Sequence, residues 1–350
     1  MVRNAKLLAA LEKMKKTVRN NEAEYPPSDE KSPSTEMSKI KIPDSREIFL
    51  KDESTHRWSG THKDRMAWEV VVSYLNLLEA MLDDRISHRD PPQFSIISSG
   101  SAAIAIGRIL YEYGLPPLKV ISDNKIGEDE KLCNAIVSSN CELYLHDLKK
   151  NEMSSEDILS LTNNQTGFDL TAFQNVTRAM VNYDWLCYEI LNYQPDFIFV
   201  PYGSGTLFRE LLHTLKSSVS IDIRRDMRLG EEIDIKRLRR CSVLGATTNN
   251  PDSFADKLYA PYRPYHTLNL HEIHYYRTCG YCGERTGVYT IREEKLKQAY
   301  DTAMKLEINC EPSGSAGLAL FLQMEKTIPI PQDSRIVVVN TGKLKLDHTT

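Results

Sequence analysis

Residues 197–207 read Phe-Ile-Phe-Val-Pro-Tyr-Gly-Ser-Gly-Thr-Leu. The apolar run predicts a buried strand, the Gly-Ser-Gly-Thr segment a tight turn, and the residues from Leu207 onward a helix. Converging backbone N–H groups, two hydroxyls and the positive end of the helix dipole make such a turn suitable for an anion, although a plain connection has the same sequence. The spacing differs from GxGxxG and GxxxxGK[ST], which disfavours a nicotinamide or nucleoside triphosphate site.

The same order of strand, turn and helix recurs along the chain. Apolar runs predict strands at Phe94–Ser98, Lys119–Ser122, Cys141–Tyr144, Asp196–Pro201, Ser218–Ile223, Arg240–Leu244 and Arg335–Asn340. Apolar residues at helical spacing predict helices at Met66–Asp83, Ala102–Tyr113, Lys131–Ser139, Asn175–Tyr193, Leu207–Ser217, Glu293–Leu306 and Ala316–Glu325. This alternation indicates an α/β fold of open parallel sheets with helices on both faces, and ligands in such folds bind beyond the carboxyl ends of the strands.

Three further turns carry glycine and hydroxyl residues at such places. Ser99-Gly100-Ser101-Ala102 follows a predicted strand and opens a helix, which suits a substrate carboxylate, although an ordinary serine helix cap has the same pattern. The other two are the segments 311–317, Glu-Pro-Ser-Gly-Ser-Ala-Gly, and 340–343, Asn-Thr-Gly-Lys. Four turns of this kind in one α/β chain indicate a shared ligand site.

A lysine with basic neighbours lies before the first long helix. Segment 59–65 reads Ser-Gly-Thr-His-Lys-Asp-Arg and follows Leu-Lys-Asp-Glu at 50–53. Lys63 at this helix entrance has two interpretations. A solvated basic end is the common one, whereas a lysine near other cations can have a lowered pKa and act as an amine nucleophile or base.

The order of these motifs resembles the fold-type II pyridoxal phosphate enzymes, the superfamily of the tryptophan synthase β-subunit. The run LKDE, SGTHKDR, SSGSAA, VPYGSGTL, EPSGSAGLAL and VVVNTGK covers about residues 45–345 in the order typical of that group. Pattern by pattern it is closest to threonine synthase. The resemblance implies a two-lobed architecture, pyridoxal 5'-phosphate as cofactor, a small amino-acid substrate, and a homodimer.

The resemblance also implies roles by position. Lys63 matches the lysine that forms the Schiff base with the cofactor and then moves the α-proton, and His62 the residue that helps hold the phosphate. The phosphate turn matches Gly203, Ser204, Gly205 and Thr206. Thr341 or Ser313 matches the hydroxyl that faces the pyridine nitrogen, and the substrate turn matches Ser99, Gly100, Ser101 and Ala102.

Two consequences follow from these matches. A hydroxyl beside the ring nitrogen, in place of an aspartate, tempers the electron sink and favours loss of a β- or γ-leaving group over transamination. Ser101 stands where the family usually has asparagine beside the cofactor, and its shorter side chain reaches less far. We therefore expect a divergent member of the group.

The predicted function is a lyase or transferase performing β- or γ-elimination or replacement, like threonine synthase. A substrate with a γ-phosphate needs additional cations, for which Arg65, Arg85, Arg89, Lys343 and Lys345 are candidates. The alternative is a cysteine synthase-like β-replacement enzyme or a serine/threonine dehydratase, which needs no second phosphate site. A non-catalytic binding module with the same fold is a second alternative, motivated by Ser101 and the polar N-terminus.

Composition and length set the remaining expectations. The 350 residues have a formal net charge of -4, and no apolar run reaches the roughly 18 residues of a membrane span, so we expect no nucleic acid, no membrane and a cytoplasmic location. Seven scattered cysteines favour free thiols over a disulfide framework. The tract His271 to Cys282 also allows a redox pair of Cys279 and Cys282 or a zinc site, but no familiar ligand spacing is present, so we predict no metal.

The predicted organisation has four parts. A short amphipathic helix opens a polar N-terminal arm, residues 1–44, that is available to wrap a neighbouring subunit. The large cofactor-binding lobe combines 45–90 with 200–345, the small lobe is 91–199, and 346–350 form a C-terminal tail. The cofactor is expected between the lobes.

Overall fold

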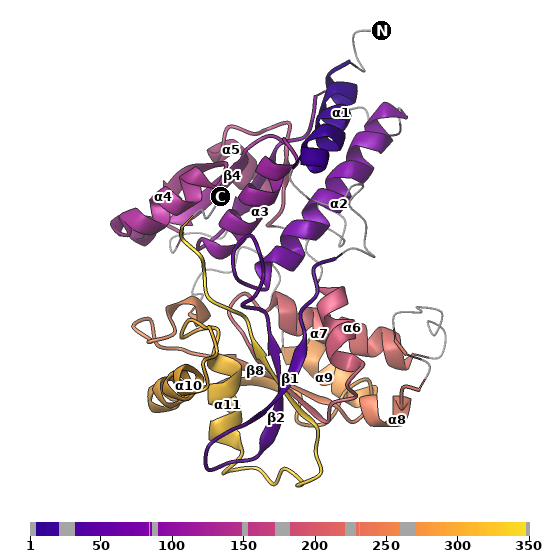
Figure 1. The fold of residues 1–350 in the computed structure, drawn as a ribbon, viewed down its shortest axis with the longest axis vertical. Coiled ribbons are helices and arrows are strands. Elements are labelled where there is room, and N and C mark those ends of the chain that lie inside the picture. Colours follow the sequence, from indigo (N-terminus) through magenta and orange to yellow (C-terminus); the bar gives the residue numbers. More distant parts are fainter. Residues whose placement is uncertain are drawn as a thin grey trace.

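The computed structural model describes residues 5–20, 32–83, 85, 90–148, 153–171, 183–220, 229–230, 232–259 and 270–347. In these residues, two sheets with helices around them form a larger and a smaller lobe (Figure 1). Every pair of neighbouring strands is parallel except one pair at an edge. The predicted α/β fold with helices on both faces of the sheets is confirmed.

The six-stranded sheet forms the larger lobe, with strand order β1-β2-β10-β7-β8-β9. Its strands are β1 (Met37–Lys41), β2 (Glu47–Asp52), β7 (Phe197–Pro201), β8 (Ser242–Thr247), β9 (Gly287–Thr290) and β10 (Ile336–Asn340), and only β1 with β2 is antiparallel. Its helices are α6 (Asp184–Leu191), α7 (Thr206–Val219), α8 (Ile235–Leu238), α9 (Leu270–Thr278), α10 (Glu293–Lys305) and α11 (Ala316–Met324).

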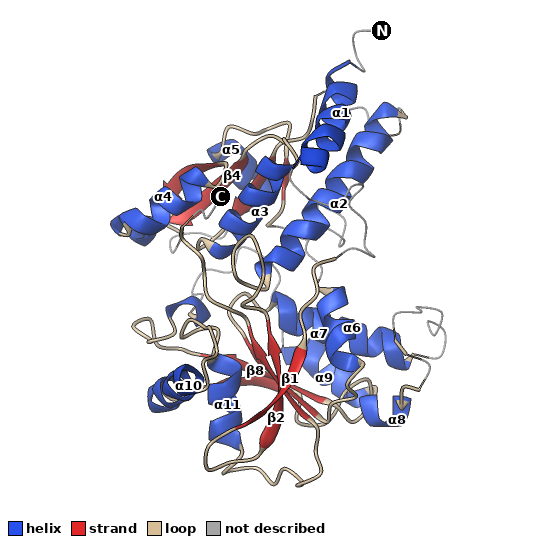
Figure 2. Ribbon diagram, in the orientation of Figure 1, coloured by secondary structure: helices blue, strands red, loops and turns tan. Residues whose placement is uncertain are grey.

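Strand β7 shows why this sheet lies inside the lobe. Ile198 and Val200 pack in one hydrophobic cluster with residues of α6 and α7, whereas Phe197 and Phe199 pack on the other face with residues of α10 and α11. Figure 2 shows the two groups of helices on opposite sides of the strands. Because successive side chains of a strand point to opposite faces, a continuous apolar run is needed where both faces are covered.

The four-stranded sheet forms the smaller lobe, with strand order β5-β4-β3-β6. Its strands are β3 (Phe94–Ile97), β4 (Leu118–Asp123), β5 (Cys141–His146) and β6 (Phe168–Asp169), and the helices around it are α1 (Ala5–Asn20), α2 (Lys63–Leu82), α3 (Ser101–Glu112), α4 (Glu130–Ser138) and α5 (Ser155–Leu161). The hydrophobic cluster under α2 and α3 continues into the larger lobe. A shared core therefore joins the lobes.

Two predicted lobe boundaries differ from the observed sheets. Helix α2 packs against α3 beside the smaller sheet, although its residues were assigned to the large lobe. Helix α6 and strand β7 belong with the larger sheet, although they begin inside the predicted small lobe 91–199. Amphipathic periodicity predicts that a helix has a buried face but does not identify the sheet against which that face packs, so these assignments failed.

The N-terminal arm interpretation is wrong for residues 37–42. Strand β1 pairs with β2, and Ile42 after it is 1% exposed in the core. An edge strand bonds through its backbone and leaves polar side chains in water, so a polar composition does not exclude it. Helix α1 carries the buried Leu7 and Met14, and residues 21–31 lie outside the described part. In the predicted tail, Leu346 packs against the core.

Two element predictions also need comment. Ser218 and Val219 end helix α7 where a strand from 218 to 223 was predicted, because short apolar runs fit either structure, and residues 221–223 lie outside the described part. The helix predicted at 175–193 is observed as α6, and residues 175–182 are not described. None of the described helices combines the length and apolarity needed to cross a bilayer.

Candidate active site

A cavity of about 170 Å³ lies beyond the carboxyl ends of β3, β7 and β10. Segments far apart in the sequence form its wall, as expected for parallel sheets. The structure brings all predicted site residues except one to this wall: His62, Lys63, Ser99, Ser101, Ala102, Gly203, Ser204, Gly205, Thr206, Ser313 and Thr341. The exception is Gly100, which is buried and caps α3 with a φ of 120°.

Lys63 is the first residue of α2 and is half-buried at the cavity wall. Its amine donates a hydrogen bond to the phenol oxygen of Tyr183 at 2.9 Å. Burial lowers the pKa of Lys63 to about 8. Roughly a tenth of the amine is then neutral at pH 7, far more than for a solvated lysine. A neutral amine at a cavity wall is suited to attack an aldehyde or to accept a proton.

Asp64 fixes the loop that leads into this lysine. Its carboxylate is buried and accepts hydrogen bonds from the backbone N–H groups of Trp58 and Ser59, at 2.6 and 2.8 Å. On the other side, the N–H of His62 donates to the carbonyl of Thr341 at 3.1 Å. The end of β10 is thus fastened to the lysine segment, and Lys63 has a defined place in the wall.

The His62 ring lies beside the same phenol, with the ring centroids of His62 and Tyr183 5.3 Å apart. Burial, and after it the charge of Lys63, hold the pKa of His62 well below its ordinary value. The imidazole is therefore neutral at physiological pH. A neutral ring still offers one N–H to an anion in the cavity.

The turn after β7 forms an anion cradle. Gly205 caps α7 with a φ of 80°, and a Cβ added there would approach the Tyr202 ring to 2.9 Å, so glycine is required by both conformation and space. A Cβ on Gly203 would lie 2.6 Å from the carbonyl oxygen of Lys257. The first N–H groups of α7 lack partners within the helix, and its dipole favours negative charge there.

The turn after β3 is held by its own serine. The hydroxyl of Ser98 accepts from the N–H groups of Gly100 and Ala103, at 3.1 and 3.2 Å. Ser99 is exposed and Ser101 is 9% exposed, and both line the cavity at the start of α3. This arrangement presents a second helix N-terminus to a carboxylate.

Arg65 does not have the role that its charge suggested. It is 1% exposed, and its guanidinium forms bidentate pairs with Glu53 (both contacts 2.9 Å) and with Glu189 (2.6 and 2.8 Å). Lys51 and His56 join the same buried network, at 2.5 Å from Glu189 and 2.6 Å from Glu53 respectively. Its charge is already neutralised, so Arg65 is not available to a substrate phosphate.

Three other cations proposed for a γ-phosphate, Arg85, Lys343 and Lys345, do not line the cavity either. Arg85 is exposed and pairs with Asp83 at 3.0 Å, Lys343 is exposed, and the amine of Lys345 donates to the carbonyl of His56 at 2.8 Å. Arg89 lies outside the described residues. Among the described residues, none of these cations is therefore placed to bind a second phosphate of a substrate.

The structure adds residues that the sequence did not indicate. Lys257, after β8, lines the cavity and pairs with Glu311 at 2.5 Å. Lys257 belongs to no motif, whereas Glu311 is the first residue of the predicted turn segment 311–317 and its position was a usable signal. Tyr183, the partner of the Lys63 amine, follows residues 172–182, which are not described, and had no sequence signal.

The cysteine tract offers no metal site within the described residues. There, no group of three or more His, Cys, Asp or Glu side chains is placed to hold a metal ion. Cys279 is exposed and Cys282 is buried, and burial raises the pKa of the Cys282 thiol. The side chain of His271 lies outside the described part.

The wall fits a phosphorylated aromatic aldehyde. The glycine cradle and the start of α7 suit the phosphate, the Lys63 amine suits the aldehyde, and the hydroxyls of Ser313 and Thr341 suit a neutral ring nitrogen. The chain belongs to the fold-type II family of pyridoxal-phosphate dependent enzymes, whose family model matches residues 30–342. Its cofactor is therefore pyridoxal phosphate.

Solved structures show the same architecture at low identity. O-ureido-L-serine synthase has a TM-score of 0.60 at 15% identity, with 88% of this chain and 89% of that chain covered. A pyridoxal 5'-phosphate-dependent aspartate racemase has 0.61 at 13%, with 95% and 94% covered, and serine racemase from Dictyostelium discoideum has 0.60 at 14%, with 96% and 98% covered. No curated protein matches significantly. These likenesses establish the fold and leave the reaction open.

Proposed function

We propose that the protein is a pyridoxal phosphate-dependent lyase that removes the β-substituent of a small amino acid such as serine or threonine. The observation that carries this proposal is the Lys63 amine, half-buried in the cavity wall with a pKa lowered to about 8. Such an amine serves in turn as the anchor of the cofactor and as the base that takes the proton from Cα.

The cavity residues have separate tasks in this proposal. The turn from Gly203 to Thr206 holds the cofactor phosphate, and the turn from Ser99 to Ala102 orients the substrate carboxylate at the start of α3. The cofactor supplies the electron sink that stabilises negative charge at Cα. Ser313 or Thr341 faces the ring nitrogen, and a neutral hydroxyl there favours expulsion of a leaving group over transamination.

The charges near the cavity favour a small leaving group over a phosphate. The threonine synthase-like reaction predicted from the motifs needs a cation for the γ-phosphate. Arg65 is engaged by Glu53 and Glu189, and Lys257 is engaged by Glu311. We therefore rank elimination of a hydroxyl, as in a serine/threonine dehydratase, above threonine synthase-like chemistry.

Replacement at Cβ, as in cysteine synthase, is the second candidate. It shares the first half of the reaction with elimination, and the exposed Ser99 at the cavity wall leaves that face open to an incoming nucleophile. A non-catalytic binding module is the remaining alternative. A homodimer belongs to the same proposal, and sedimentation equilibrium tests it.

The decisive experiment screens amino acids against the loaded protein. L-Serine, L-threonine, O-acetylserine and phosphohomoserine are added in turn, the visible cofactor band and 2-oxo acid release are followed, and chiral chromatography detects racemisation. We expect 2-oxo acid from serine or threonine, none from phosphohomoserine, and no product from Lys63→Ala. The proposal is refuted if D-serine is the main product, or if no amino acid changes the cofactor band.

A further inference from the structure

The phenol of Tyr183 contacts the one amine on which the proposed chemistry depends. Its oxygen accepts the hydrogen bond from Lys63 at 2.9 Å, and the amine lies 5.3 Å from the centre of the Tyr183 ring. The tyrosine is 1% exposed, so little water competes for this hydrogen bond. Geometry and burial together make the contact well defined.

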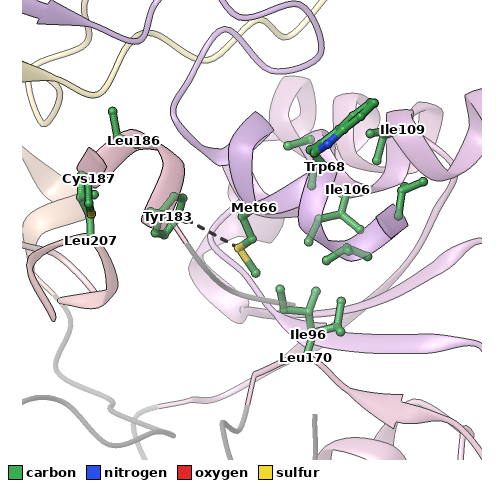
Figure 3. Packing of buried hydrophobic residues seen from close by; sticks show 14 of the residues in the cluster. Met66, Trp68, Ile96, Ile106, Ile109, Leu170, Tyr183, Leu186, Cys187 and Leu207 are labelled. Atoms are coloured by element: carbon green, nitrogen blue, oxygen red, sulfur yellow. Dashed lines mark hydrogen bonds between the residues drawn. The ribbon is translucent and has the colours of Figure 1, made fainter. Parts of the chain in front are cut away.

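The other side of the phenol explains its orientation. Tyr183 immediately precedes α6, and its hydroxyl donates to the sulfur of Met66 on α2 at 3.7 Å (Figure 3). Figure 3 also shows Leu186 and Cys187 on the helix that begins after it. Because the phenol proton points to the thioether, an oxygen lone pair is left to face the amine.

The helix that begins at Lys63 and the helix that follows Tyr183 are also joined by charge. Arg65 of α2 and Glu189 of α6 form a bidentate pair with contacts of 2.6 and 2.8 Å. A planar guanidinium paired with a carboxylate in this way restricts both distance and orientation. The ion pair between Arg65 and Glu189 therefore also restricts the distance between the Lys63 amine and the Tyr183 phenol.

We propose that Tyr183 is a positioning residue that holds the Lys63 amine at the cavity wall whenever that amine is not bonded to the cofactor. This inference rests on the proposed role of Lys63. A released lysine side chain has many rotamers, whereas proton transfer at Cα and return to the cofactor both need the amine within hydrogen-bond reach. The phenol selects the rotamers that keep it there.

The test measures attachment of pyridoxal phosphate to the full-length chain after removal of its cofactor. Attachment rates are recorded against pH for the wild type, Tyr183→Phe and Met66→Leu, and borohydride reduction with peptide mass spectrometry identifies the labelled lysine. Tyr74→Phe is the matched control, because it removes another buried phenol hydrogen bond, to the carbonyl of Pro92 at 2.7 Å, away from the cavity.

The expected change has a defined sign. An ammonium group donates more strongly than a neutral amine, so the phenol favours the charged form of Lys63. In Tyr183→Phe the midpoint pH of attachment falls by about half a unit to one unit, and the plateau rate at high pH falls by roughly tenfold. The other titratable groups that line this cavity in the described chain are His62, Lys257 and Glu311, and all are unchanged in the variant.

Met66→Leu keeps the side-chain volume but removes the acceptor of the phenol proton. The hydroxyl can then donate to the neutral amine, so the midpoint pH of attachment in Met66→Leu moves in the same direction by less. This variant decides the question if Tyr183→Phe does not fold. A midpoint in Tyr183→Phe equal to that in Tyr74→Phe overturns the role of Tyr183. Labelling of a wild-type lysine other than Lys63 overturns the proposed role of Lys63 as well.

Discussion

Replacing Arg65 with methionine tests how much the buried charge network stabilises the fold. Methionine keeps an unbranched apolar chain and removes the guanidinium. Four charge-assisted hydrogen bonds are lost, two to Glu53 and two to Glu189. The side chain of Glu53 is 0% exposed, so water cannot replace its lost partner.

The structure sets the size of the effect. Burial alone would raise the pKa of Glu53, but Arg65 and His56 hold it well below its ordinary value. Without Arg65, the nearest basic side chains are His56 at 2.6 Å and Lys51 at 3.8 Å, so less interaction opposes the effect of burial on the Glu53 carboxyl. Removing one partner of a buried ion pair costs about 3–5 kcal/mol, which is a large part of the total stability of a typical domain.

Urea unfolding measures this loss, with Arg57→Met as the control. Arg57 also pairs with a glutamate, Glu112 at 2.9 Å, but its side chain is 57% exposed. An exposed pair contributes at most about 1 kcal/mol. We expect the free energy of unfolding to fall several times more in Arg65→Met than in Arg57→Met. Equal losses in the two variants would refute the assignment of stability to the buried network.

The pH dependence provides a second check with a known sign. The pKa of the Glu53 carboxyl is depressed in the folded protein, so its contribution is present above the ordinary value of 4.5 and is lost as pH falls through the folded value. Arg65→Met should weaken this acid-dependent loss, because the depressed pKa depends on the guanidinium. An unchanged acid profile would contradict the pairing of Arg65 with Glu53.

Three further outcomes are expected. Attachment of pyridoxal phosphate to Lys63 should become faster with rising pH, with half of the plateau rate near pH 8, and a flat profile from pH 6 to about 9 would contradict the lowered pKa. Gly205→Ala forces a side chain into a positive φ and against the Tyr202 ring, so the melting temperature and the cofactor affinity in fluorescence titration should both fall, with a backbone strain of about 1–2 kcal/mol. Glu311→Gln removes the ion-pair partner of Lys257, so borohydride labelling should then be found on Lys257 as well as on Lys63. Labelling of Lys63 alone would show that the ion pair with Glu311 is not what keeps the Lys257 amine from the cofactor.

The sequence predicted strands near β3, β4, β5, β7, β8 and β10, and the turns that follow β3, β7 and β10. Continuous apolar runs such as Ile336–Asn340 have few alternative structures, and glycine with hydroxyl residues after a strand is a local signal. The edge strand β1 was not predicted, because it pairs with β2 through backbone hydrogen bonds and has few apolar side chains. Tyr183 and Lys257 escaped it because their roles arise from contacts across the fold.

Charge was the least predictable feature of the candidate site. Arg65 beside Lys63 is equally compatible, in the sequence, with a substrate-binding cation and with a buried structural one. The outcome depends on Glu189, more than a hundred positions later, which packs its carboxylate against the guanidinium. No periodicity or motif records such a pairing, so the sequence could not show that Arg65 is unavailable to a substrate phosphate.

The wall of the cavity takes residues from Thr61 to Thr341, and the end of β10 is bonded to the segment that carries Lys63. During synthesis, β10 must therefore have left the ribosome before this cavity can be complete. A chain cleaved before β10 would keep the amine of Lys63 but would lack Thr341 in the cavity wall.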